Sequence, residues 1–246
     1  MPMRRARRLV SVAVVASLAV TGLSACRSAP SVAAYIGAYK ITETRVTDMY
    51  NEVHDAIAAA TPPKPGEQVA MPITRNDVAR VLVSSQVLPE VAKQHNATLP
   101  ADLPVDNYAT ALHIPASTEF VKLFAQSDAY VSVLKQNVTG APALSEADLR
   151  EVYDALIATG QLTTDTPFDQ FKTALPQENT QAVQSAVAVR DQIKQVAGTM
   201  NLTINPRYEP MSIPVLLVQT QQGDVKSLLN APLGSNDSGV PVSAAS

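Results

Sequence analysis

Few residues of this 246-residue chain have the types and the spacing that chemistry requires. The three histidines, His54, His95 and His113, lie far apart, whereas a metal site needs His, Cys or carboxylate ligands in a cluster. The sequence contains no G-x-S-x-G elbow, H-E-x-x-H pair, P-loop or G-x-G-x-x-G loop. We therefore predict no metal, no cofactor and no catalytic residue, and we expect the histidines to be solvated or to cap helices.

Three acidic residues, Asp148, Glu151 and Asp154, lie close together along one predicted helix. Paired carboxylates can separate their pKa values and act as general acid and base. Acidic residues near the start of a helix more commonly interact with its dipole on a solvated face. We expect the solvated arrangement, so the chain is predicted not to be an enzyme.

The remaining candidate site is an apolar surface. Phe120, Phe124 and Tyr130 hold a large share of the scarce aromatic residues, which number seven Tyr and four Phe without any Trp. Apolar grooves between helices accept extended or helical peptides, so these three residues are candidates for peptide binding. The alternative is that their rings form the core of the domain.

The most specific motif is Leu23-Ser24-Ala25-Cys26, which contains the only cysteine. Four of the first eight residues are arginine, and an apolar run covers residues 9–23. A basic start, an apolar segment and small residues predict a secretory signal peptide over residues 1–25. The cysteine after the small residues has the form of a bacterial lipobox, with cleavage after Ala25 and acyl chains on Cys26.

Lipidation would hold the protein on the extracytoplasmic face of a bacterial membrane by a tether of residues 26–31, since buried acyl chains contribute about 0.8 kcal/mol per CH₂. Two alternatives to a lipobox are an uncleaved anchor helix and an ordinary signal peptide with an incidental cysteine.

Cleavage after Ala25 would remove four arginines and leave 15 basic against 22 acidic residues, a net charge of −7. This charge disfavours nucleic acid as a partner, and it also disfavours electrostatic attraction to anionic lipid.

Apolar residues recur mostly at helical spacing, which predicts a mainly α fold. We expect one domain over residues 32–210, which begins with a small hairpin over residues 32–41 and ends with a short strand at residues 202–204. Residues 211–246 are predicted to be an extended or disordered tail, in which 213–219 could form a strand or an extended arm. The expected helices cover residues 42–60, 74–95, most of the stretch between Pro115 and Gly140, 145–160, 166–175 and 177–200.

The order of these elements resembles the SurA/PrsA/PpiD group of extracytoplasmic chaperones. The matching segments are Tyr35-Ile36-Gly37 with Lys40-Ile41-Thr42, then Val87–Leu99, Leu144–Tyr153 and Phe168–Pro206. The resemblance implies a helical, SurA-like chaperone core in which Val32–Ile36 pairs with Leu202–Ile204. It also implies a parvulin isomerase domain after the fourth helix, but only Gly160–Asp165 fills that position, too little for a domain.

The function expected from these features is non-catalytic, chaperone-like binding of unfolded or exported polypeptides at the membrane surface. The alternative is an accessory lipoprotein that acts as a scaffold for one dedicated cell-envelope protein. Both require the lipid on Cys26 as the contact with the membrane.

Overall fold

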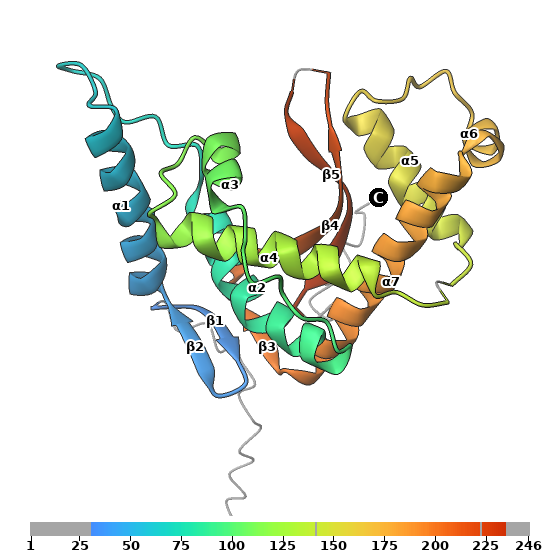
Figure 1. Cartoon of the computed structure of the whole chain (residues 1–246), viewed down its shortest axis with the longest axis horizontal. Coiled ribbons are helices and arrows are strands. Elements are labelled where there is room, and N and C mark those ends of the chain that lie inside the picture. Colours follow the sequence, from blue (N-terminus) through green and yellow to red (C-terminus); the bar gives the residue numbers. More distant parts are fainter. Residues whose placement is uncertain (1–30, 141, 222, 235–246) are drawn as a thin grey trace, which may run out of the picture.

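The computed structural model describes residues 31–140, 142–221 and 223–234, and helices dominate it (Figure 1). The mainly α prediction is confirmed. The predicted signal peptide over residues 1–25, the predicted lipidation site Cys26 and residues 235–246 lie outside the described residues. In chain order the elements are β1 (Val32–Ile36), β2 (Tyr39–Thr42), α1 (Glu43–Ala60), α2 (Arg75–Gln94), α3 (Val105–Leu112), α4 (Glu119–Gln136), α5 (Glu146–Ala158), α6 (Phe168–Ala174), α7 (Gln177–Thr199), β3 (Leu202–Ile204), a 3₁₀ turn (Pro206–Tyr208), β4 (Met211–Gln219) and β5 (Val225–Leu233).

Local sequence fixes where several helices begin. Thr74 and Asp77 form a reciprocal capping box at the start of α2, and Ser145 and Asp148 form another at the start of α5. Each box satisfies backbone N–H groups that the first helical turn leaves without partners. The helices therefore begin where the capping residues predict.

The first and last parts of the predicted domain share one small sheet. Its strand order is β2-β1-β3, and Ala34 on β1 lies opposite Ile204 on β3 in an antiparallel pair. At the tip of the β1–β2 hairpin Gly37 has a φ of +58°, which glycine adopts without strain. The pairing that the resemblance implies between residues 32–36 and 202–204 is therefore confirmed.

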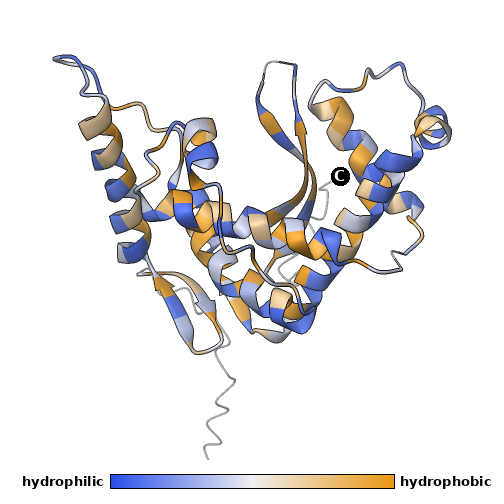
Figure 2. Ribbon diagram, in the orientation of Figure 1, coloured by the Kyte–Doolittle hydropathy of each residue, from blue (hydrophilic) through white to orange (hydrophobic). Residues whose placement is uncertain are grey.

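The core centres on α2, which packs against α1, α4 and α7. Val78, Val83, Val87, Leu88 and Val91 along α2 are fully buried. In Figure 2, apolar and polar positions alternate along α4 and α7, as expected for helices with one buried face.

The apolar core continues around α5 and α6. Tyr153 packs edge-on against Phe168, with ring centroids 5.4 Å apart, and contacts Phe171 at 5.5 Å. The Tyr153 hydroxyl donates to the carbonyl of Thr166 at 2.6 Å, and the guanidinium of Arg150 lies 3.7 Å from the centre of the Phe168 ring. These contacts pack α5 against α6 and hold the loop between the two helices in place.

Residues 211–233 are not a disordered tail: the strand considered for residues 213–219 is present, and a second strand that was not expected follows it. This segment forms the antiparallel strands β4 and β5, which pack against α7 and bring Ile213, Val215, Leu229 and Ala231 into the core. The apolar residues of β4 cover α7, and this burial stabilises the hairpin beyond its local turn sequence.

Candidate functional site

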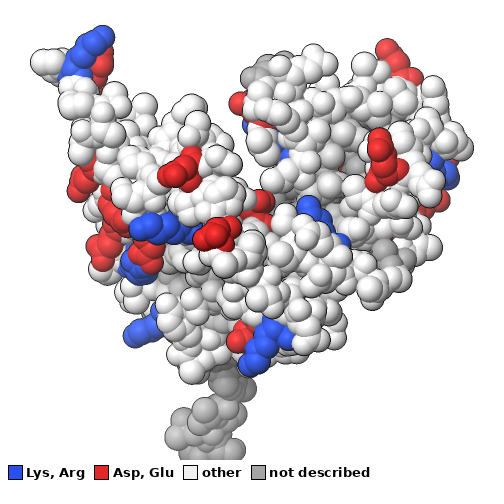
Figure 3. Space-filling view, in the orientation of Figure 1, with Lys and Arg blue, Asp and Glu red and all other residues white. Residues whose placement is uncertain are grey.

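A notch lies where α2, α4 and β4 meet, on the side of the molecule away from the β1–β2 hairpin (Figure 1). Figure 3 shows a hollow there, between the lobe that carries α1 and α3 and the β4–β5 hairpin, with mainly uncharged atoms around it. The cavity at its floor has a volume of about 70 Å³. The notch is lined by Arg80, Val81, Ser84, Phe124, Ser127, Asp128, Val131, Ile213, Pro214 and Leu217.

The floor of the notch is apolar and its rim is accessible. Val81, Val131 and Ile213 are almost fully buried, so the three elements hold the floor rigidly. Leu217 is 44% exposed, which is unusual among the large apolar side chains of the described residues. A rigid apolar floor with one exposed apolar side chain suits the burial of a side chain from a binding partner.

The polar residues of the notch already have partners. The Arg80 guanidinium pairs with Asp77 at 2.5 Å, and Asp128 accepts a hydrogen bond from the Tyr108 hydroxyl at 2.6 Å. Burial and this hydrogen bond raise the pKa of Tyr108 well above its ordinary value. These contacts hold the Arg80 and Asp128 side chains in fixed positions, from which they can orient a partner.

The three aromatic candidates do not share one surface. Phe120 is 1% exposed and belongs to the core, so it cannot contact a partner directly. Tyr130 is half-buried against the core and does not line the notch. Phe124 does line it, and its ring connects Phe120 at 6.2 Å to Tyr108 at 5.9 Å between centroids.

Sequence reasoning allowed a strand at residues 213–219 but did not place it beside α2 and α4, so Ile213, Pro214 and Leu217 were not recognised as residues of the notch. Met211, Ile213 and Val215 alternate with less buried residues along β4, which is the strand signal available in the sequence.

The expectation that Asp148, Glu151 and Asp154 lie together on a solvated face is wrong for Asp148. Its side chain is 12% exposed and pairs with Arg190 of α7 at 2.7 Å, while Glu151 pairs with the same arginine at 3.3 Å. Burial alone would raise the pKa of Asp148, but hydrogen bonds from Ser145 and Arg190 outweigh it and lower that pKa. Asp191 completes the set around Arg190 at 2.9 Å, and Asp154 is exposed. The cluster links α5 to α7, with the Arg190 guanidinium placed between the carboxylates of Asp148, Glu151 and Asp191.

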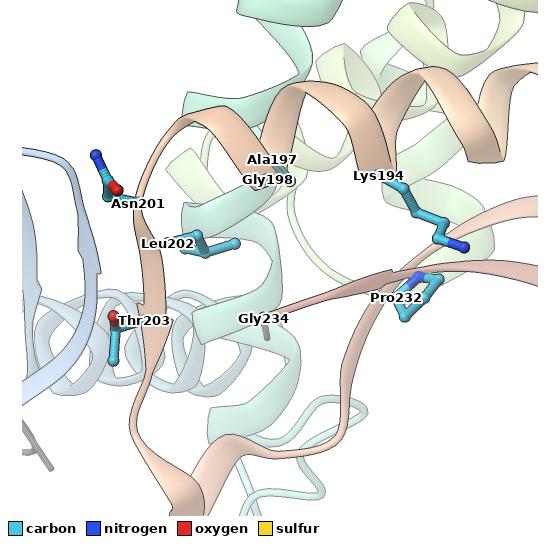
Figure 4. Close-up of a pocket in the computed structure, with 8 residues that line it drawn as sticks. All are labelled: Lys194, Ala197, Gly198, Asn201, Leu202, Thr203, Pro232 and Gly234. Carbon is cyan, nitrogen blue, oxygen red and sulfur yellow. The ribbon is translucent and has the colours of Figure 1, made fainter. Parts of the chain in front are cut away.

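Two polar cavities flank α7, with volumes of about 530 Å³ and 410 Å³. Lys194 and Pro232 line both, and Figure 4 shows the smaller one, where Leu202 points inward from β3. The larger cavity adjoins the Arg190 cluster. Lys194 is the one charged residue in the lining of the smaller cavity, which leaves it without an acid–base pair.

The histidines occupy structural positions. His95 ends α2 and His113 ends α3, the latter with a φ of +55°, while His54 contacts Asp55 at 3.0 Å. Within residues 31–140, 142–221 and 223–234, no three His, Cys, Asp or Glu side chains are grouped in a way that could hold a metal ion. Cys26 lies outside these ranges.

Comparisons of the chain with protein-family models, with curated proteins and with solved structures found no match. The resemblance to the SurA/PrsA/PpiD group therefore stays a prediction. In the described part of the chain, every helix is too short or too polar to cross a membrane.

Proposed function

We propose that this protein is a lipid-anchored, extracytoplasmic chaperone of SurA-like architecture that binds unfolded or exported polypeptide segments without catalysis. The notch between α2, α4 and β4 is the proposed binding site. Its apolar floor and the exposed Leu217 are the observation on which the proposal rests.

The geometry of the notch suits a loose, general binding mode. Pro214 and Leu217 present aliphatic surface above the buried Val81 and Val131. The Tyr108–Asp128 and Arg80–Asp77 pairs provide polar groups at the rim. A partner that inserts one apolar side chain and lays its backbone across the rim would gain roughly 1.5–3 kcal/mol from that side chain. Such a small site favours many weakly bound segments over one ligand of fixed shape.

Two further features support the proposal. The lipobox at Cys26 predicts attachment at the membrane where exported chains emerge. The pairing of β1 with β3 agrees with the arrangement that the resemblance to this chaperone group implies.

The test compares two exposed apolar residues on the same hairpin. Leu217→Asp places a charge in the notch, whereas Val225→Asp changes a residue that is 61% exposed and does not line it. Because 1.4 kcal/mol corresponds to a factor of ten, we expect Leu217→Asp to weaken binding of an unfolded client about tenfold. Val225→Asp should leave binding unchanged.

Light scattering of an aggregating client, and fluorescence anisotropy of a labelled unfolded peptide, measure this binding. Equal binding by both variants would exclude the notch as the site. If the unmodified protein binds no client while one envelope protein co-purifies with it in stoichiometric amounts, the scaffold function replaces the chaperone function.

A further inference from the structure

Tyr39 is the exposed aromatic residue nearest to the N-terminal entry of the described chain. It is 51% exposed, and the other large apolar side chains with comparable exposure among the described residues, Leu217 and Val225, lie on the β4–β5 hairpin. Tyr39 is on β2 at the hairpin tip, opposite Ile36, and Lys40 beside it is also exposed. The tip therefore presents an aromatic ring and an ammonium group together.

The chain enters the hairpin at its open end, at the opposite end of β1 from the tip. The backbone N–H of Glu43 donates to the carbonyl of Ser31 at 2.9 Å, and Val32 lies opposite Thr42 in the β1–β2 pair. Tyr39 is three residues along β2 from Thr42, a distance of about 10 Å at strand spacing. The tip thus lies about one short strand length from Ser31, a distance that the tether can span.

The length of the tether limits how far this end can lie from a bilayer. Residues 26–31 number six, and a fully extended chain spans at most about 3.3–3.6 Å per residue, so a lipid on Cys26 lies within about 20 Å of Val32. Helix α1 leads away from this end over 18 residues, or about 27 Å. An anchored molecule consequently keeps the β1–β2 hairpin close to the lipid headgroups.

We infer that the hairpin tip, residues 38–40, contacts the headgroup region of the bilayer, with the Tyr39 ring at the interface and Lys40 beside lipid phosphates. Tyrosine suits this position because its ring is apolar and its hydroxyl is polar. The contact is too small to bind a membrane alone, and the tether supplies the effective concentration that makes it form. This inference rests on the lipid anchor of the proposed function. With the hairpin tip at the bilayer, the notch would face away from the membrane.

The chain offers a clean test because it contains one cysteine and no tryptophan. The chain from Cys26 onward is coupled through Cys26 to a maleimide lipid in vesicles of phosphatidylcholine and phosphatidylglycerol. Tyr39→Trp and the matched control Val225→Trp each carry a single fluorophore, on the two different hairpins. Circular dichroism and thermal melting confirm that both variants keep the fold.

On coupling, we expect the Trp emission of Tyr39→Trp to move to shorter wavelength and to be quenched by brominated lipids. The emission of Val225→Trp should stay unchanged, and vesicles without maleimide should change neither variant. Unchanged emission from Tyr39→Trp, or equal quenching of both variants, would overturn the inference.

Chemical coupling supplies the anchor, so this result does not depend on lipidation in a cell. Metabolic labelling of Cys26 with a fatty acid, with Cys26→Ala as the control, tests the anchor itself. Failure of the labelling would refute the lipoprotein proposal and leave the vesicle result to be judged separately.

Discussion

The side-chain amide of Asn205 donates a hydrogen bond of 2.9 Å to the carbonyl of Val32, a residue 173 positions earlier in the chain. The backbone N–H of Asn205 also donates to the carbonyl of Ala33 at 2.9 Å, and its Oδ1 accepts from the N–H of Arg207 at 3.2 Å. Asn205 is 8% exposed. One buried amide thus extends the β1–β3 pairing and begins the following 3₁₀ turn.

Replacing Asn205 should destabilise the protein. Asn205→Ala removes the donor to Val32 and the acceptor for Arg207, and a buried carbonyl left without its partner costs about 1–3 kcal/mol. Asn205→Asp keeps the acceptor but loses the donor, so it should also be destabilised. Urea unfolding measures both free energies. If only Asn205→Ala loses stability, the hydrogen bond to Val32 contributes little to the free energy of unfolding.

The pairing of Asp148 with Arg190 should make stability depend on acid pH. The pKa of Asp148 is lowered from its ordinary value of 3.8, so its contribution is complete above that value and is lost as pH falls through the folded-state pKa. Asp148→Asn should cost about 2 kcal/mol at neutral pH and flatten this acid dependence. Asp154→Asn, an exposed change on the same helix, is the control for unfolding measured from neutral to acid pH.

A second pH dependence is expected at Tyr208, which is 3% exposed and donates to Glu43 at 2.7 Å. Burial and the Glu43 carboxylate raise the pKa of Tyr208 to about 12. The folded state therefore holds the hydroxyl proton of Tyr208 more tightly than the unfolded state does. The stabilisation from this proton is complete below pH 10.0 and is lost as pH rises towards 12. Tyr208→Phe should remove this alkaline loss, whereas Tyr39→Phe should not. Unfolding free energies at alkaline pH test the difference.

Two phenylalanines of α4 should separate stability from binding. Phe120→Ala empties a buried core position and should cost about 3–5 kcal/mol. Phe124→Ser changes a half-buried ring that lines the notch, so it should lose client binding at a smaller cost in stability. Thermal melting measures the stability of each variant, and anisotropy of a labelled peptide measures its client binding. If Phe124→Ser binds the client as tightly as the unmodified protein does, Phe124 is not part of the binding site.

Local signals in the sequence predict most of the helices and the first hairpin. Thr74, Ser145 and Gly37 act through caps and turn geometry within a few residues, so their effect is visible in the sequence. The pairing of β1 with β3 follows from the resemblance to a chaperone group, since nothing local connects two strands so distant in the chain.

The features that sequence reasoning missed depend on contacts between distant segments. Strand β5 contains Asn230 and Pro232, which weaken its strand signal, and it is held by β4 and α7. Arg190 lies between Val189 and Asp191 on α7, and its contact with α5 appears only when that helix brings Asp148 and Glu151 to it. The notch likewise exists because β4 packs beside α2 and α4.

The position of β3 and β4 near the end of the chain has a consequence for export. A polypeptide that crosses a membrane N-terminus first delivers β1 long before its partner β3, and pairing across such a separation is slow. The last wall of the notch arrives later still, with Ile213, Pro214 and Leu217. Under the proposed function, a partly translocated copy therefore lacks the notch and exposes an apolar surface of its own, so it would resemble a client until its final strands emerge.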